Sequence, residues 1–501
     1  MLTVSFPPGK LDWIVWFALI PLLKNLENES YSNAFTLGLI TGLAHYLTLI
    51  YWIVVVLETY GGLHFLLSFG VLLLLSLYLS LYPALFSFLI CYVKITRFRV
   101  FMTASLWVSL EYIRAKALTG FPWCLLGYTQ YKHLNLIQIA DLVGVYGLSF
   151  LIVVFNVFIF SLLFDRQFRG HKKMYKWEVL IILLMAFLTL AYGHHRVSAS
   201  GGDHRKQKSI KLSIIQGNID QSIKWNPAYQ GKTINLYQKL TRTTYRFKPH
   251  LIVWPETSVP FFFQNRTRFS NKVFEISKES GAHLIFGSPA YRRENSKTIY
   301  YNRAYHLSPN GELTGYYDKV HLVPFGEYVP LKKFLPFVHR LVPAAGDFAS
   351  GKEIAPLKLP HLSAGVLICF EVIFPELART HTKKGAEILV NMTNDAWFGM
   401  TSAPYQHLSM AVFRAVENGR PLIRAANTGF SAFISPRGKI INQSSLFRKE
   451  ILNHEESLVD APLSFYTRHG DIFAFAMLFI NLINIFYILC YHKILIRMKP
   501  T

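Results

Sequence analysis

Three short stretches of the sequence each bring an apolar run to a side chain that can do chemistry. These are Val366–Val372 with Cys369, Leu251–Glu256 with Glu256, and Tyr316–Glu327 with Lys319. A thiol, a carboxylate and an ammonium can divide the work of covalent acyl transfer. The carboxylate removes a proton, the thiolate attacks, and the ammonium stabilises the oxyanion. The residue types therefore make these three a candidate catalytic triad.

Each of the three also has an ordinary structural interpretation. A lone Cys between Ile368 and Phe370 is most often a small buried hydrophobe. Glu256 could be a surface acid or lie beside a helix N-terminus, and Lys319 could be a solvated loop cation. Spacing alone does not show that the three side chains meet.

The order of motifs resembles a known family. WPE at Glu256, DKVHLVPFGEYVP at Lys319 and CFE at Cys369 are followed by NDAWFG at 394–399 and by Arg420-Pro421. This order is similar to the Glu-Lys-Cys nitrilase superfamily and, more narrowly, to the bacterial apolipoprotein N-acyltransferases. Two further segments carry the narrower resemblance, QGNIDQSIKW at 216–225 and TGFPW at 119–123. The likeness covers nearly the whole chain.

The resemblance implies a role for each member of the triad: Glu256 as general base, Lys319 as oxyanion partner and Cys369 as the nucleophile that forms a thioester. It also carries four supporting residues onto this sequence, namely Trp225, Glu327, Phe370 and Glu371. Glu327 is expected to position the Lys or a proton-transfer water, and Glu371 to hold the strand tip. Phe370 departs from the Tyr that is common in the family. No cofactor and no metal is implied.

The implied reaction is N-acylation of the N-terminal S-diacylglyceryl-cysteine of apolipoproteins, the last step of lipoprotein maturation. It would run by a ping-pong route with a glycerophospholipid acyl donor. The expected partners are that donor, a diacylglyceryl apolipoprotein acceptor and the lipid bilayer, and we expect a monomer.

Two other functions compete with this one, a membrane-tethered nitrilase-type amidase and a non-catalytic membrane receptor or transporter. An amidase needs only one anchor, whereas several spans and the TGFPW segment favour lipid handling. A transporter predicts charges along a membrane path, and apart from Glu111 and a few His the apolar runs carry few.

Composition places part of the chain in lipid. The 501 residues give room for two or three domains, and 52% of them are hydrophobic, which is too many for an ordinary soluble protein. The net charge of +23 does not come with a nucleic-acid-binding motif, and the cations concentrate beside apolar runs, so we expect no nucleic-acid partner. The cysteines are too few and too scattered for a disulfide framework: Cys91, Cys124, Cys369 and Cys490.

Long apolar runs predict membrane spans of roughly 20 residues each. Five are clear, at 35–57, 65–93, 143–164, 177–192 and 471–491. Trp13–Leu23 and Val100–Ile113 add two shorter ones, for a total of seven. The family usually has one more N-terminal span. We expect no removable signal peptide.

Cations at 94–99, 165–176 and 493–501 predict that these segments are cytoplasmic. The catalytic domain would then lie on the periplasmic side of a bacterial inner membrane. Basic residues at 196–211 argue the other way, but large translocated domains weaken the charge rule.

The expected domains follow this order: a membrane domain of about six transmembrane helices at 1–192, a linker at 193–208, an extracytoplasmic nitrilase-like catalytic domain at 209–465, a C-terminal transmembrane helix at 471–492 and a basic cytoplasmic tail at 493–501. Within the catalytic domain, short β-branched and aromatic runs alternate with helical patterns, which is typical of an α/β fold. Strands are expected at 210–216, 251–254, 283–287, 304–307, 365–369, 388–391, 422–426 and 431–434, and helices at 233–246, 271–280 and 407–418. A four-layer α-β-β-α sandwich is implied by the resemblance.

Histidines are not expected to take part. His407 lies in a helical pattern, and the Glu and Lys already fill the roles that a Cys–His dyad would need. His194, His195 and His204 lie in the basic linker without a Cys or carboxylate framework, so we do not expect them to bind metal.

Overall fold

Two compact units make up the chain in a computed structural model, and each is described by itself. The helical unit comprises Met1–Tyr51, Phe69–Ser198 and His469–Thr501, and the α/β unit comprises Trp52–Ser68 and Ala199–Arg468. The structure describes residues 1–93, 98–165, 172–199, 207–294, 297–329, 347–459 and 461–497.

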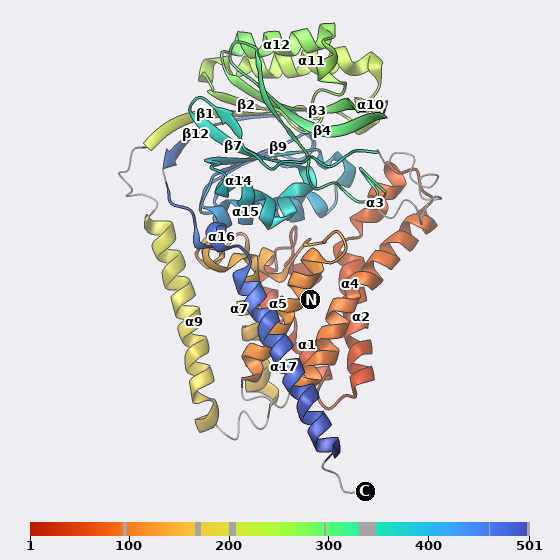
Figure 1. Cartoon of the computed structure of the whole chain (residues 1–501), viewed down its shortest axis with the longest axis vertical. Helices are drawn as coiled ribbons and strands as arrows, with labels where there is room; N and C mark the ends of the chain where they lie inside the picture. The colour runs from red at the N-terminus through yellow and green to blue at the C-terminus, as the bar shows by residue number, and fades with distance from the viewer. Residues whose placement is uncertain are drawn as a thin grey trace. The chain divides into compact units, whose positions relative to one another are not determined.

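The α/β unit contains two six-stranded sheets (Figure 1). The first has the order β12 (Glu450–Val459), β1 (Gln207–Gln216), β2 (Leu251–Val253), β3 (His283–Glu294), β4 (Lys297–Leu307) and β5 (Leu313–Asp318). The second has the order β11 (Ile440–Gln443), β10 (Ala432–Ile434), β9 (Leu422–Ala426), β8 (Ile388–Thr393), β7 (Leu362–Ile368) and β6 (Leu357–Leu359). The central strands β1–β2–β3 and β7–β8–β9 are parallel, and the outer pairs are antiparallel.

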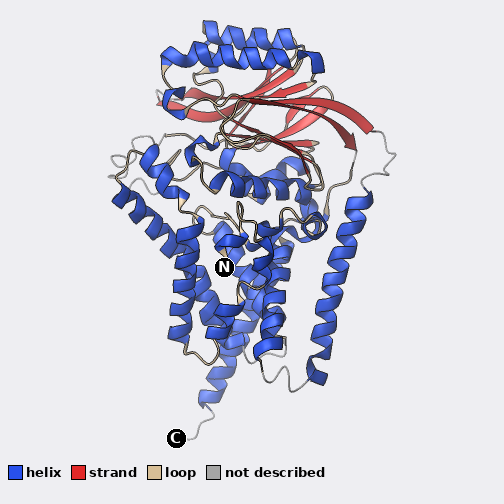
Figure 2. Cartoon of the chain, turned by 180° about the vertical axis from the view of Figure 1, so that it is seen from behind, coloured by secondary structure: helices blue, strands red, loops and turns tan. Residues whose placement is uncertain are grey.

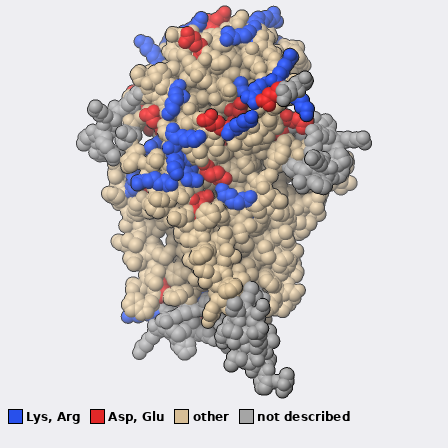
Figure 3. All heavy atoms as spheres, viewed as in Figure 1, with Lys and Arg blue, Asp and Glu red and all other residues tan. Residues whose placement is uncertain are grey.

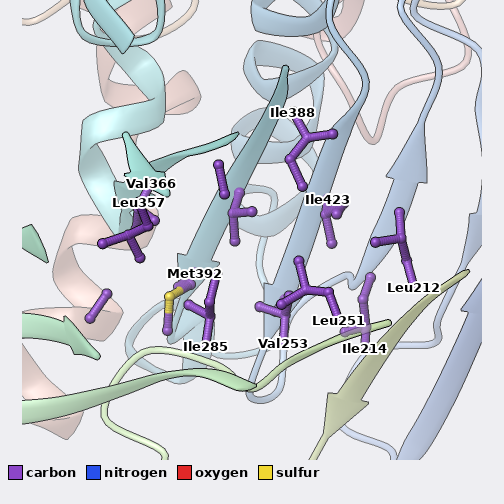
Figure 4. Packing of buried hydrophobic residues seen from close by; sticks show 14 of the residues in the cluster. Leu212, Ile214, Leu251, Val253, Ile285, Leu357, Val366, Ile388, Met392 and Ile423 are labelled. Carbon is purple, nitrogen blue, oxygen red and sulfur yellow. The ribbon is translucent and has the colours of Figure 1, made fainter. Parts of the chain in front are cut away.

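Side chains from both sheets fill the space between them, as Figure 4 shows. Successive residues of a strand point to opposite faces. On β2, Leu251 and Val253 therefore face the second sheet, while Ile252 belongs to a different cluster on the outer face. Ile285 of β3 and Val366 of β7 lie in the inner cluster together with Cys369.

Helices cover the outer face of each sheet and complete four layers (Figure 2). On the first sheet, α11 (Pro227–Thr243) and α12 (Arg268–Ser280) bury Ile234 and Val273 against it. On the second sheet lie α14 (Pro375–Lys383) and α15 (Ala403–Asn418). The expected α-β-β-α sandwich is confirmed.

All eight expected strands and all three expected helices of this unit are present, with shifted ends. The sequence prediction missed β5, β6, β11, β12, α14 and two short helices, α10 (Gln221–Lys224) and α16 (Phe465–His469). β12 carries five polar residues between Asn453 and Ser457 and pairs only at an edge with β1. A strand of this kind lacks the apolar run on which the prediction relied.

The helical unit contains α1 (Ile20–Asn25), α2 (Tyr31–Leu49), most of α4 (Phe65–Val93), α5 (Arg99–Lys116), α6 (Leu134–Ile137), α7 (Ala140–Phe164), α9 (Lys172–Ser198) and α17 (Ile472–Arg497). Among the described residues, three helices are long and apolar enough to cross a membrane, Phe65–Cys91, Ala140–Phe164 and Lys176–Ser198. Large apolar side chains stay exposed on them, such as Phe187 at 66%. On the face of the molecule drawn in Figure 3, almost all charged side chains lie on the α/β unit. The helices on this face therefore present a mainly apolar surface, as lipid-facing segments do.

Two expected spans are not single helices. The run 35–57 divides into α2 and α3 (Trp52–Thr59), which are bent by 50° at the break, and α3 belongs to the α/β unit. There Trp52 donates to Gln406 at 3.2 Å, and the Tyr60 hydroxyl donates to the Ala396 carbonyl at 2.8 Å. These tertiary contacts, which no hydropathy pattern records, account for the break.

The run Trp13–Leu23 divides into a 3₁₀ helix at Asp12–Trp16 and α1. Asn156 replaces the lost helical hydrogen bonds, because its amide accepts from Leu19 N and donates to Val15 O, both at 2.9 Å. With the bent pair counted as one span, up to four described helices could cross a membrane, and Ile472–Tyr487 is a shorter apolar helix. The total of seven spans stays a prediction.

The expected linker at 193–208 is shorter at both ends, because α9 continues to Ser198 and β1 begins at Gln207. Part of each cation cluster used for the orientation lies outside the described residues, namely Lys94, Arg97, Arg166, Arg169 and Lys499.

Candidate active site

Glu256, Lys319 and Cys369 each follow the carboxyl end of a strand. Glu256 comes after β2 and Lys319 directly after β5. Because β3, β4 and β5 are successively antiparallel, β5 runs in the direction of β2 and ends at the same edge of the sheet. Cys369 follows β7 and begins a short 3₁₀ helix, Cys369–Ile373. Carboxyl ends of strands are where open α/β sheets place their sites.

The turn at Cys369 is sharp. Its φ is 52°, in the left-handed region that a residue with a Cβ seldom adopts. Thr257, next to Glu256, has a φ of 47°. Such backbone strain persists only where the surrounding structure holds it, and it concentrates at functional sites.

Lys319 and two carboxylates form a buried charged cluster. The Lys319 Nζ lies 2.8 Å from Glu327 Oε2 and 4.0 Å from Glu256 Oε1. Asn302 Nδ2 donates to Glu256 Oε1 at 2.7 Å and to Glu327 Oε1 at 2.8 Å. Lys319 is 1% and Glu256 6% exposed. Charges this deep in the protein interact far more strongly than at a surface.

The two oxygens of the Glu256 carboxylate differ. Asn302 holds Oε1, whereas Oε2 is buried and has no hydrogen-bond partner among the described residues. A carboxylate with one oxygen held and the other open has the geometry of a proton acceptor.

Cys369 lies within the electrostatic reach of both groups. Burial first and the charge of Glu256 second raise the pKa of its thiol to about 12, although the charge of Lys319 opposes them. Burial alone would lower the pKa of Lys319, but the charges of Glu327, Cys369 and Glu256 outweigh it and raise that pKa. The resting pair is therefore a neutral thiol beside an ammonium, so a base is needed to form the thiolate.

Glu371 ties the Cys369 turn to the Lys319 segment. Its Oε2 accepts from Ile368 N at 2.7 Å, and its Oε1 accepts from Val320 N at 2.7 Å and Tyr317 Oη at 2.9 Å. Burial raises the pKa of Glu371 to about 7, although main-chain donors and the Lys319 charge oppose it.

A second buried charge network lies near Cys369. Asp395 Oδ2 accepts from Arg424 at 2.7 Å, and its Oδ1 pairs with His407 Nδ1 at 3.1 Å and accepts from Thr393 at 2.8 Å. Burial raises the pKa of Asp395, but the charges of Arg424 and His407 outweigh burial and hold it below its ordinary range. His407 therefore pairs with a carboxylate, and its ring also has a hydrogen bond to the main chain of Cys369.

The remaining expected residues lie at the margin. Phe370 packs its ring against Phe374, with centroids 5.3 Å apart. Trp225 is 47% exposed and lines a cavity of about 360 Å³. The other lining residues are Gln230, Pro260, Phe261, Phe262, Asn265, Thr267, Pro289, Tyr300 and Phe348.

Backbone connections place this aromatic cavity beside the charged cluster. Tyr300 and Asn302 are two residues apart on β4, so their side chains leave the same face of the strand. Phe348 donates its main-chain N–H to the carbonyl of Glu327 at 3.0 Å.

Sequence reasoning missed the contacts of Asn302, Lys224 and Asp395 with other segments. Asn302 lies inside β4, just before the apolar run that predicted this strand, and its two carboxylate partners come from other segments. Asp395 belongs to the NDAWFG motif, but its position in the sequence does not predict the ion pair with Arg424. Among the described residues, no group of three or more His, Cys, Asp and Glu could hold a metal ion.

Comparisons with known proteins identify the families that the two parts of the chain match. Residues 1–158 match the family described as the apolipoprotein N-acyltransferase N-terminal domain, and residues 211–461 match the carbon-nitrogen hydrolase family. A carbon-nitrogen hydrolase structure from Helicobacter pylori G27 is 19% identical, with a TM-score of 0.39, and the match covers 50% of this chain and 89% of that one.

Two curated relatives cover most of the chain. The apolipoprotein N-acyltransferase of Pasteurella multocida is 32% identical over 90% of this chain and 86% of its own length. That of Geobacter metallireducens is 45% identical over 95% of this chain and 91% of its own length. The chain belongs to the apolipoprotein N-acyltransferase family.

Proposed function

We propose that this protein transfers an acyl chain from a glycerophospholipid to the α-amino group of a diacylglyceryl-cysteine on an apolipoprotein, through a thioester on Cys369. The observation that carries the proposal is the open Oε2 of Glu256, buried beside Lys319 and within the electrostatic reach of a neutral thiol. The names of the relatives supply the acceptor class.

In the first half-reaction, Glu256 takes the proton of the Cys369 thiol, and the thiolate attacks the ester carbonyl of the donor. Lys319 stabilises the oxyanion. When the intermediate collapses, a carbon–sulfur bond remains and the carbon–oxygen bond breaks. The lysophospholipid alkoxide leaves with the proton that Glu256 held.

In the second half-reaction, the acceptor amine attacks the thioester. Glu256 receives the amine proton, the carbon–sulfur bond breaks, and the thiolate leaves behind an amide. The proton on Glu256 then returns to the thiolate, which restores the resting site.

The aromatic cavity supports a lipid donor. Its volume of about 360 Å³ falls in the range of ligand pockets, and five of its ten lining residues are aromatic. Such a wall accepts hydrocarbon and excludes water, which would suppress hydrolysis of the thioester.

Intact mass spectrometry tests the mechanism. After incubation with a phospholipid in detergent, the wild-type protein should gain the mass of one acyl group, and an apolipoprotein acceptor should remove it. Cys369→Ala should gain none while it inserts into membranes normally. An equal adduct on the Ala variant, or none on the wild type, would overturn the thioester.

We also propose that the catalytic unit lies on the periplasmic side of the inner membrane, on the strength of the cations at 94–99, 165–176 and 493–501. Reporter fusions at residues 170 and 300 should report the cytoplasm and the periplasm, respectively. A report of the same side from both would contradict this orientation.

A further inference from the structure

A second buried lysine lies at the catalytic cluster. Lys224 ends a short helix, α10 (Gln221–Lys224), and is 2% exposed. Its Nζ donates to the main-chain carbonyl of Glu256 at 3.2 Å. Burial of an ammonium is costly unless nearby groups compensate it. A single carbonyl is poor compensation for a full positive charge, so a nearby negative charge is expected to contribute.

The distances around Glu256 indicate which charge that is. Lys319 lies 2.8 Å from Glu327 but 4.0 Å from Glu256, so it compensates Glu327 better. Asn302 bridges the two carboxylates through one nitrogen, which places like charges close together. Like charges disfavour each other's ionised forms. Two carboxylates and one lysine leave an excess of one negative charge, and a second cation removes it.

We propose that Lys224 is a positioning residue for the base: its ammonium holds the main chain of Glu256 at the end of β2 and supplies the second positive charge that keeps this carboxylate ionised. The inference rests on the proposed role of Glu256 as the proton acceptor for Cys369. Lys224 acts through Glu256 and takes no part in bond making.

The titratable groups at this site come from several segments. Lys224 faces the charges of Glu256 and Cys369, which oppose the effect of burial on it. Lys319 acts on both of these groups, Asp395 acts on Cys369, and Glu327 pairs with Lys319. Burial lowers the pKa of Lys224 to about 8, so the ammonium stays charged at neutral and acidic pH.

Loss of this charge should change how thiol activation depends on pH. A carboxylate without its neighbouring cation keeps its proton to a higher pH. The acid limb of the pH–rate profile should therefore move to higher pH. A cation within hydrogen-bonding range of the residue typically accounts for about 1 pH unit or more. A merely structural loss would lower the rate equally at every pH and leave the limb in place.

Alkylation by iodoacetamide tests the inference without any lipid. The thiol proton passes to Glu256, the Cys369 sulfur displaces iodide, and peptide mapping separates this site from the other cysteines. The full-length protein in detergent is measured from pH 4.5 to pH 9 as wild type and as Lys224→Met, Lys224→Gln and Lys224→Arg. Gln keeps an N–H donor for the carbonyl but lacks the charge, and Arg keeps the charge.

We expect the acid limb to move upward by about 1 pH unit in the Met and Gln variants and to stay in place in the Arg variant. The control Lys232→Met removes an exposed cation from α11 and should leave the limb unchanged. If Met does not fold, Gln carries the test. An unmoved limb in Gln, or an equal shift in Arg, overturns the inference.

Phospholipid separates this result from the proposed function. If wild-type protein forms no acyl adduct while the alkylation limb still moves in the Gln variant, the proposed donor is wrong and the role of Lys224 stands. If the adduct forms but the limb does not move, the proposed function stands and the role of Lys224 is wrong.

Discussion

Asn302 holds Glu256 through a hydrogen bond of 2.7 Å to Oε1 and leaves Oε2 without a partner among the described residues. The same amide nitrogen donates to Glu327 at 2.8 Å. One neutral side chain therefore orients the proposed base and links it to the carboxylate that pairs with Lys319.

Replacement of Asn302 by Leu should slow formation of the acyl adduct on Cys369 by about tenfold or more. A buried carboxylate that loses a hydrogen bond to a neutral donor loses roughly 1 to 3 kcal/mol, and Glu256 would also lose its orientation. The measurement is the single-turnover rate by intact mass spectrometry. The matched control is Asn235→Leu on the exposed side of α11. An unchanged rate in Asn302→Leu would show that this hydrogen bond does not position the base.

Glu371 predicts a specific dependence of stability on pH. Burial raises its pKa from the ordinary value of 4.5 to about 7. A carboxyl group with a raised pKa binds its proton more tightly in the folded state. Its contribution to the free energy of unfolding is therefore complete below about pH 4.5 and is lost as pH rises through about 7.

Thermal melting of wild type and Glu371→Gln at pH 5 and pH 8 checks this. The side chain of the variant cannot titrate at this position, so the Tm of the wild type should exceed the Tm of the variant by more at pH 5 than at pH 8. Glu275→Gln, an exposed change on α12, serves as the control. A difference in Tm that is the same at both pH values would refute the raised pKa.

The aromatic cavity should set the preference for acyl-chain length. Gln230→Trp adds bulk to the wall of the cavity. The rate with a sixteen-carbon donor should fall by about tenfold or more, because loss of a few buried methylenes costs about 0.8 kcal/mol each. The rate with an eight-carbon donor should fall far less. Lys239→Trp places the same ring on an exposed position of α11 as a control. Equal losses with both donors would show that the chain binds elsewhere.

The sequence predicted the central strands of both sheets and singled out the three residues that follow strand ends, and the reasons are local. Glu256, Lys319 and Cys369 each lie in a motif at the end of an apolar run, where the residue types and their periodicity predict the end of a strand. Asn302 and Lys224 were missed because their roles at the site depend on contacts with Glu256, which comes from another segment of the chain. A single amide or lysine inside a strand or short helix carries no signal of its own until the sheets are assembled.

The break between α2 and α3 shows the same limit in the apolar segments. Hydropathy treats 35–57 as one run, because the scale sees only side-chain character. Trp52 within that run and Tyr60 just after it form hydrogen bonds to partners more than 300 residues away, Gln406 and Ala396. Long-range contacts of this kind decide where a helix ends.

Substitutions of Lys319 distinguish a role in catalysis from a role in substrate binding. If its ammonium stabilises the oxyanion, Lys319→Met should lower the single-turnover rate of adduct formation on Cys369 by on the order of 3 kcal/mol of transition-state stabilisation, the typical loss for one oxyanion donor. Phospholipid affinity should change far less. Because Met also leaves Glu327 without its ion pair, the melting temperature must be measured beside the rate. Lys319→Arg keeps the charge but spreads it over a larger planar group, so in a buried site it should restore little of the rate. Should Met lower affinity and rate in equal proportion, or Arg restore the full rate, Lys319 would be an anchor for the donor's head group rather than the oxyanion partner.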